Sequence, residues 1–221
     1  MKALRAHRPR QRGLTLIETL VALLVLAIMA GLGWRGLQSF LQTRERVQAQ
    51  TERFEPVRVG LAQWRHDLDQ LATGSDRPLW QWDGKVLRLT RRGPASEADL
   101  RVVAWARLDE DGHWARWLSP PLQRQQDWQQ AWDQALQWGR GELRLAPPGV
   151  TVSRLFVLDG WKFDVHRGGA WVNPMSSQSE GQDPIDTSRV PSALRLELRL
   201  PEDARLQGLL RVDWLNPSFV R

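Results

Sequence analysis

The chain has 221 residues, which is enough for one domain of ordinary size with an extension but short for two full domains. Hydrophobic residues make up 42% and charged residues 25%, so wholesale disorder, a collagen-like repeat and a protein with many membrane spans are excluded. The sequence holds no cysteine, which excludes disulfides, thiolate zinc sites and a cysteine nucleophile.

The net charge of +6 is concentrated at the N-terminus. Residues 1–13 contribute +5, and the remaining 208 residues carry 26 basic and 25 acidic side chains. No basic stripe interleaved with aromatic residues occurs in the body of the chain, so we expect no nucleic-acid partner. The basic residues of the N-terminal segment are Lys2, Arg5, Arg8, Arg10 and Arg12.

The first apolar segment runs from Leu14 to Trp34 and has Glu18 as its only charged residue. As a helix it covers about 30 Å, the thickness of the hydrocarbon core of a bilayer. The cations before it predict a cytoplasmic N-terminus with the rest of the chain across the membrane. A plain membrane anchor and a secretory signal peptide cut after Ala30 are two explanations of this segment.

Gly13 and Glu18 favour a third explanation. A glycine ends the basic leader, and a carboxylate follows five residues later at the cytoplasmic edge of the apolar run. An ionisable group at this place is costly in lipid and needs a partner of opposite charge. Neither a plain membrane anchor nor a signal peptide has a use for such a group. Residues 13–18, G-L-T-L-I-E, closely resemble the type IV pilin and pseudopilin motif G-F-T-L-I-E, with Leu14 in place of the usual phenylalanine.

This resemblance implies both processing and assembly. A prepilin peptidase would cut between Gly13 and Leu14 on the cytoplasmic side and methylate the new amine of Leu14. The apolar helix would be kept as the core of a filament. Glu18 would become the fifth residue of the mature chain and pair with the N-terminal ammonium of a neighbouring subunit. The physics agrees, because opposite charges in a low-dielectric core must meet or become neutral.

Residues 35–71 show an amphipathic pattern, with apolar residues at intervals of three and four. Pro56 predicts a kink or short break near Glu55. The pattern after it predicts a helix packed on a sheet, and we assign His66 and Asp67 to its solvated face. The apolar stripe consists of Val57, Leu61, Trp64, Leu68 and Leu71, and the opposite face carries Arg44, Glu45, Glu52, Arg53, Arg65 and Asp69.

From about residue 79 the pattern is mostly that of β-strands. Residues 109–112 predict the turn of a hairpin. Leucines alternate with charged residues over 193–200, which predicts a sheet with one solvent-exposed face. Residues 124–138 predict a helix, and the polar stretch 176–188 predicts a mobile loop. The expected strands are 85–90, 100–108, 113–118, 150–158, 161–166, 170–172, 193–200 and 206–214.

Further stretches resemble the J-type minor pseudopilin of the type II secretion system (general secretion pathway protein J). They include D-G-H-W-A-R-W at residues 111–117 and P-S-A-L-R-L-E-L-R-L-P at residues 191–201. The resemblance implies an α+β pseudopilin fold, in which a long N-terminal helix packs on a β-rich head with two antiparallel sheets. The implied divisions are a removed leader (1–13), a transmembrane part (14–34), an amphipathic periplasmic helix (35–72) and the head (73–221).

The implied function is that of a non-enzymatic subunit at the tip of the periplasmic pseudopilus. The chain would cross the inner membrane once, with the N-terminus in the cytoplasm and the head in the periplasm. Implied partners are the I-type and K-type minor pseudopilins, the major pseudopilin, the prepilin peptidase and the inner-membrane assembly platform. Two alternatives stay open: a minor pilin of a type IV pilus or competence system, and a periplasmic binding module or enzyme whose mature chain begins at Gly31.

The sequence offers no clear catalytic or metal site. Paired-histidine, nucleophile-elbow and phosphate-loop spacings do not occur, so we expect no catalytic residue, cofactor, metal or small-molecule substrate. Asp109, Asp111 and Gly112 are interpreted as a turn, because the bidentate glutamate of a calcium loop is missing. Calcium binding in the 176–188 loop, which contains Glu180, Asp183 and Asp186, stays open.

Thirteen tryptophans are an unusual number for this length. Most should fill the core between sheet and helix, because tryptophan buries a large area. Trp34 is placed at the far membrane interface. Trp128, Trp132 and Trp138 lie on the helix 124–138 and are the candidate partner surface, because tryptophan is common at the centre of interfaces.

Overall fold

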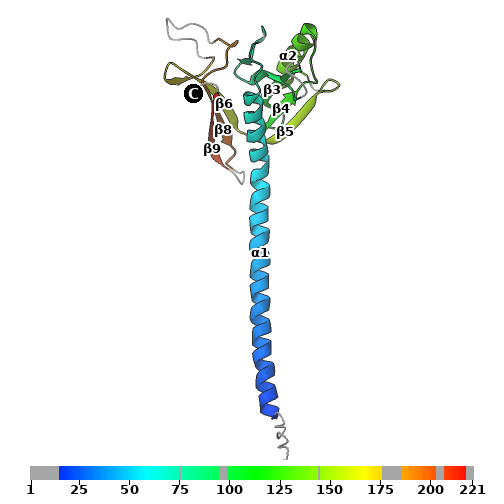
Figure 1. Cartoon of the computed structure of the whole chain (residues 1–221), viewed down its shortest axis with the longest axis vertical. Helices are drawn as coiled ribbons and strands as arrows, with labels where there is room; N and C mark the ends of the chain where they lie inside the picture. The colour runs from blue at the N-terminus through cyan, green and yellow to red at the C-terminus, as the bar shows by residue number, and fades with distance from the viewer. Residues whose placement is uncertain are drawn as a thin grey trace, which may run out of the picture. The chain divides into compact units, whose positions relative to one another are not determined.

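The computed structural model describes residues 15–74, 76–94, 99–143, 145–175, 186–202 and 207–217, with the side chains of 45–47 and 49–53 left out. The chain divides into two compact units, Met1–Thr51 and Glu52–Arg221. Helix α1 (Leu16–Asp69) contributes to both units, and the second unit contains the sheets (Figure 1). The α+β architecture, a long N-terminal helix followed by a β-rich head with two antiparallel sheets, is the predicted one.

Of the kink or short break expected near Glu55, the break does not occur, because α1 continues through Pro56. A proline inside a helix removes one backbone donor and crowds the preceding turn. Pro56 is exposed, so its ring displaces no packed neighbour. The helix ends at Asp69, three residues before the predicted boundary, and Leu71 then forms an isolated bridge with Arg91.

The first sheet has the order β1-β2-β3-β4-β5. Its hairpin β3–β4 has the predicted turn, in which Gly112 adopts a φ of 72° and the N–H of Leu108 donates to the carbonyl of His113 at 2.9 Å. Strand β1 was not predicted, because three residues carry no periodic signal. The strands are β1 (Trp80–Trp82), β2 (Val86–Arg92), β3 (Leu100–Arg107), β4 (His113–Leu118) and β5 (Thr151–Val157).

The second sheet has the order β7-β6-β8-β9. The predicted alternation of β8 is confirmed, because its leucines are buried while Arg195, Glu197 and Arg199 lie on the other face. Strand β9 pairs with β8 along its whole length, from Gly208↔Leu200 to Leu215↔Ala193. The strands are β6 (Gly160–Arg167), β7 (Ala170–Val172), β8 (Ala193–Leu200) and β9 (Gly208–Leu215).

Two apolar cores hold the second unit together. The larger core joins the end of α1, through Trp64 and Leu68, to the facing sides of both sheets. The smaller core lies on the other face of the first sheet, under helix α2 (Gln125–Gly139). The first sheet is therefore covered on both faces, which explains why the central residues of β2, β3 and β4 are almost all buried.

Candidate functional site

The start of α1 is organised by Thr15. Its carbonyl accepts hydrogen bonds from the N–H groups of Glu18 at 3.0 Å and Thr19 at 3.2 Å. The Thr19 hydroxyl donates to the Leu16 carbonyl at 2.8 Å. Glu18 therefore lies in the first turn of α1, where the positive end of the helix dipole favours a negative charge.

Apolar residues flank Glu18 along α1, and their side chains are not covered by the rest of the described chain. Leu16 is 82% exposed and Ile17 is 71% exposed. Exposed apolar residues continue along α1, and the segment Leu16–Arg44 is long and apolar enough to cross a membrane by its length and composition. A helix that is apolar on all sides needs lipid or other apolar helices around it, so Glu18 is a lone acid at one end of such a segment.

The structure describes only some of the other residues that were predicted for this site. Gly13 and Leu14, the predicted cleavage and methylation residues, lie outside the described part of the chain. The predicted partner of Glu18 belongs to a neighbouring subunit, so this pairing stays a prediction. Trp34 is 62% exposed on α1.

The candidate partner surface on α2 is wrong. Trp128, Trp132 and Trp138 are buried against the first sheet, with exposed fractions of 3%, 4% and 6%. Trp128 and Trp132 stack at 5.0 Å between ring centroids, and the guanidinium of Arg88 lies 4.6 Å from the Trp132 ring. These tryptophans hold α2 on the sheet, because they are the largest apolar side chains of the helix, and Leu136 packs against the same core.

The assignment of Asp67 to a solvated face is also wrong. Asp67 is fully buried, and each oxygen of its carboxylate accepts two hydrogen bonds. Arg116 donates to both oxygens at 2.7 Å, Arg91 donates to Oδ1 at 3.0 Å, and the Trp105 indole donates to Oδ2 at 3.0 Å. Burial lowers the pKa of the Arg91 guanidinium, and Asp67 opposes that effect. The sequence contained a sign of this burial, because position 67 falls between Trp64 and Leu68 of the apolar stripe.

Two acidic residues in turns of the head, Asp111 and Asp186, accept hydrogen bonds from residues close to them in the sequence. Asp111 accepts a hydrogen bond from the N–H of His113 at 3.0 Å, which confirms the turn interpretation. Asp186 accepts hydrogen bonds from the N–H and hydroxyl of Ser188, and these bonds lower the pKa of Asp186. Glu180 and Asp183 lie outside the described residues. Among the residues that are described, no cluster of three metal-binding side chains occurs.

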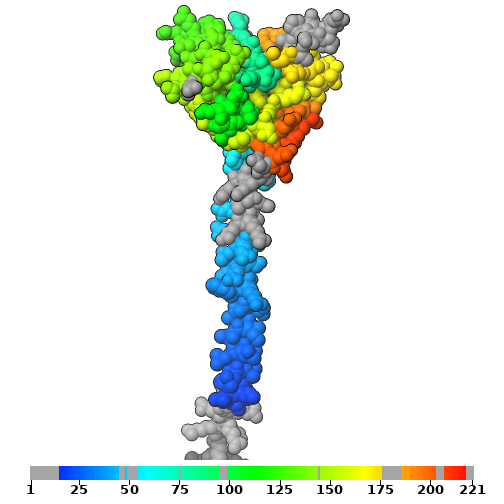
Figure 2. Space-filling model, turned by 180° about the vertical axis from the view of Figure 1, so that it is seen from behind, coloured from blue at the N-terminus to red at the C-terminus, as the bar shows by residue number. Residues whose placement is uncertain are grey.

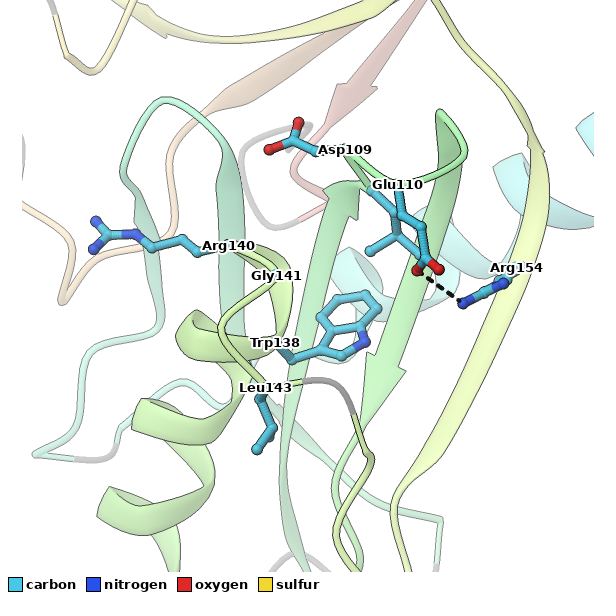
Figure 3. A pocket seen from close by; sticks show the side chains of 8 residues that line it. Asp109, Glu110, Trp138, Arg140, Gly141, Leu143 and Arg154 are labelled. Atoms are coloured by element: carbon cyan, nitrogen blue, oxygen red, sulfur yellow. Dashed lines mark ion pairs between the residues drawn. The ribbon is translucent and has the colours of Figure 1, made fainter.

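A cleft of about 530 Å³ lies between the end of α2, the β3–β4 turn and β5 (Figure 3). Trp138 and Leu143 form its apolar side, and Arg154 points toward Glu110 at 3.8 Å. Other charges around it are also paired, Arg140 with Asp83 at 2.9 Å and Arg154 with Asp111 at 3.1 Å. The cleft thus has mutually compensated charges, and the lining residues that the structure describes include no histidine or hydroxyl nucleophile.

Comparison with known proteins supports the importance of the N-terminal site. Residues 8–34 match a family model described as the prokaryotic N-terminal methylation motif. A search of curated proteins finds no significant match to the chain. The motif and the apolar helix support a pilin-like or pseudopilin class, processing by a prepilin peptidase and membrane-associated assembly. They fit a membrane-anchored protein with a soluble head.

Proposed function

We propose that this chain is a non-enzymatic minor pseudopilin of the J type, located at the tip of the type II secretion pseudopilus. The observation that carries the proposal is the position of Glu18 in the first turn of an exposed apolar helix, within a matched methylation motif. A carboxylate at this place has a physical purpose only if a cation from another chain meets it in an apolar surrounding.

The proposed location follows from the charges that flank the helix. The basic leader stays in the cytoplasm, α1 crosses the inner membrane, and the head lies in the periplasm. The assignment to the J type is supported by the stretches that resemble that family. Residues 191–201 contain β8, the strand between β6 and β9, and residues 111–117 contain the turn into β4.

In this role the head binds other subunits and does not catalyse a reaction. It assembles with the I-type and K-type minor pseudopilins and the major pseudopilin on the inner-membrane platform, and thereby primes the filament for protein export. The paired charges of the cleft at Trp138 are compatible with a structural head.

Mass spectrometry of the N-terminal peptide, from the membrane fraction of the host, tests the class. The expected mature chain begins with N-methyl-Leu14. The Gly13→Leu variant is the control and should keep its leader, because the cleavage residue is changed. A mature chain that begins at Gly31 would show an ordinary exported protein and overturn the proposal.

Co-purification of the full chain from the same membranes tests the subtype. The proposal expects the I-type and K-type minor pseudopilins in the complex. Recovery of type IV pilus subunits in their place would assign the chain to a pilus or competence system, with which it shares the N-terminal motif.

A further inference from the structure

Strand β9 lies at an edge of the second sheet and is long and regular. An open edge presents unpaired N–H and C=O groups that pair readily with another strand. The eight residues of β9 pair with β8 without a register shift and include no proline, and no described strand pairs with the other side of β9. Strand β7, at the opposite edge, has only three residues. Figure 2 shows the orange and red surface of β8 and β9 at one margin of the head.

The hydrogen bonds to β8 determine which backbone groups of β9 lie at the free side. The N–H of Asn216, the residue after β9, donates to the carbonyl of Ser192 at 2.9 Å. In an antiparallel ladder, residue pairs that exchange hydrogen bonds alternate with pairs that do not. Even-numbered residues of β9 therefore bond to β8, and odd-numbered residues direct their N–H and C=O groups to the free side. These odd-numbered residues are Leu209, Arg211, Asp213 and Leu215.

The side chains of the same four residues lie on the side of the sheet away from the core, because the residues between them pack toward it. Leu209 is 59% exposed and Leu215 is 61% exposed. Arg211 and Asp213 lie between the two leucines, and each pairs with an opposite charge on β8, at 2.7 and 2.6 Å. Strand β9 therefore carries no net charge that would repel an approaching strand.

The pattern of β9 is complementary to itself. When two β9 strands run antiparallel about a twofold axis at Val212, Arg211 of each copy faces Asp213 of the other. Leu209 of each copy then faces Leu215 of the other. Opposite charges and apolar pairs stabilise directly facing positions of antiparallel strands. In this register the free N–H and C=O groups of the four residues also meet one another, so that the facing residues form hydrogen-bonded pairs.

Other registers of two β9 strands are less favourable. A twofold axis at Arg211 or at Asp213 brings two like charges face to face, which destabilises the pair. Parallel pairing in register does so at both charged positions. A shift by one residue places the solvent-facing side chains of one strand on the core side of the other. The sequence of β9 therefore selects one antiparallel register.

We propose that β9 is a self-association edge, through which two copies of the chain pair antiparallel about Val212. The two four-stranded second sheets thereby become one continuous sheet. The occupant of the edge is a second copy, because the pattern that the edge requires is the pattern that β9 itself carries. The inference concerns the second unit alone and does not rest on the proposed function.

Disulfide trapping tests the pairing, because the chain has no cysteine of its own. The full chain with Val212→Cys is oxidised in detergent micelles. On the twofold axis the two cysteines form a pair without backbone hydrogen bonds, with Cα atoms about 4.5 Å apart, a separation that a disulfide spans.

The variant Leu145→Cys is the matched control, since Leu145 is 84% exposed in a loop outside the sheets. The disulfide-linked dimer of Val212→Cys should form about tenfold faster than that of the control, because pairing raises the effective concentration of the second thiol. Equal rates for the two variants would overturn the proposal.

A mixture of two variants tests the register. Leu209→Cys and Leu215→Cys should each form little homodimer, because in the proposed register each cysteine lies about 20 Å from its equivalent in the other copy. Mixed together, they should form the heterodimer, because the two positions face each other. Homodimers that form as fast as the heterodimer would indicate parallel pairing and overturn the antiparallel arrangement.

Cations at both ends of the edge should prevent the pairing. Leu209→Lys with Leu215→Lys, added to Val212→Cys, places lysine opposite lysine and should slow disulfide formation on the order of tenfold. Leu145→Lys in the same background is the matched control and should leave the rate unchanged. An unchanged rate in a lysine variant whose tryptophan fluorescence shows a folded head would overturn the self-association edge. That result would leave the proposed function standing, because the substitutions lie far along the chain from the processing motif.

Discussion

Asp67 and Asp69 lie two residues apart at the end of α1 and bind different sheets. Asp67 accepts hydrogen bonds from Arg116 at 2.7 Å in the first sheet, and Asp69 accepts one from Trp214 at 2.7 Å in the second sheet. Two residues turn a helix by about 200°, so the two carboxylates point to nearly opposite sides. The last turn of α1 therefore fixes both sheets by polar contacts, in addition to the apolar core around Trp64.

Removing the charge of Asp67 should destabilise the head strongly. In Asp67→Asn two buried arginines lose their shared carboxylate, which costs about 3 kcal/mol or more of unfolding free energy. Chemical unfolding of the full chain in detergent, followed by tryptophan fluorescence, measures this loss. Asp69→Asn is the control and should cost about 1 kcal/mol, because only one hydrogen bond to an indole is weakened. Equal effects of the two variants would show that Asp67 has no special role.

Adding one methyl group at Gly139 should destabilise the contact between α2 and β2. A Cβ there would lie 2.5 and 2.7 Å from the methyl carbons of Val86, which is too close without movement of the helix. Overpacking of this kind costs about 1–3 kcal/mol, and the thermal unfolding midpoint of Gly139→Ala should fall. Gly160→Ala is the matched variant, since a Cβ at Gly160 meets no atom within 4 Å. An unchanged midpoint for Gly139→Ala would contradict the packing described.

Asp83 should make the stability of the head depend on pH in the acid range. Burial raises the pKa of Asp83, but hydrogen bonds from the N–H groups of Val86 and Lys85 and from Arg140 outweigh it, so the pKa lies below its usual value. A lowered pKa in the folded state gives stability that is fully present above the unfolded value of about 3.9. That contribution is lost as the pH falls through the folded value.

The variant Asp83→Asn isolates this contribution. The difference in unfolding midpoint between the parent and Asp83→Asn should be constant from neutral pH down to about pH 4. It should then shrink as the pH is lowered further, because the parent carboxylate becomes protonated. A difference that grows toward acid pH would contradict the assignment.

Replacing Glu18 should impair assembly without unfolding the head. In Glu18→Leu the apolar surface of α1 is kept, but the carboxylate that would meet a neighbouring ammonium is lost. Incorporation into the filament complex should fall on the order of tenfold, the effect of losing about 1.4 kcal/mol of subunit contact. Quantitative co-purification measures this fall, and Glu18→Asp should retain part of the incorporation. Full incorporation of Glu18→Leu would contradict the proposed pairing.

The sequence predicts most of the secondary structure of the head. The alternation in β8 and the turn at Gly112 identify their strands almost to the residue, because both patterns are local. The helix 124–138 was equally clear from its spacing. Strand β1 was missed, because a strand of three residues depends on its pairing with β2 and not on its own pattern. Of the kink or short break expected near Glu55, the break does not occur, because an exposed proline can be accommodated without ending a helix.

The candidate site, like the fold, could be predicted only in part from the sequence. The residues from Gly13 to Glu18 and the apolar run after them are recognisable in the sequence alone, because a processing enzyme and a lipid bilayer both act on a contiguous segment. Trp128 and Trp132 could not be assigned to surface or core from the sequence, since a tryptophan serves both. The structure buries them beside Arg88 because the outer face of the first sheet is apolar and needs a cover.

The sequence by itself thus determined the membrane segment, the processing motif and the local elements, which all depend on neighbours along the chain. Only the tertiary structure decided that Asp67 is buried while Asp69 remains exposed. The physical reason is that burial depends on residues brought together from distant parts of the chain. Arg116 is 49 residues from Asp67, and Trp214 is 145 residues from Asp69.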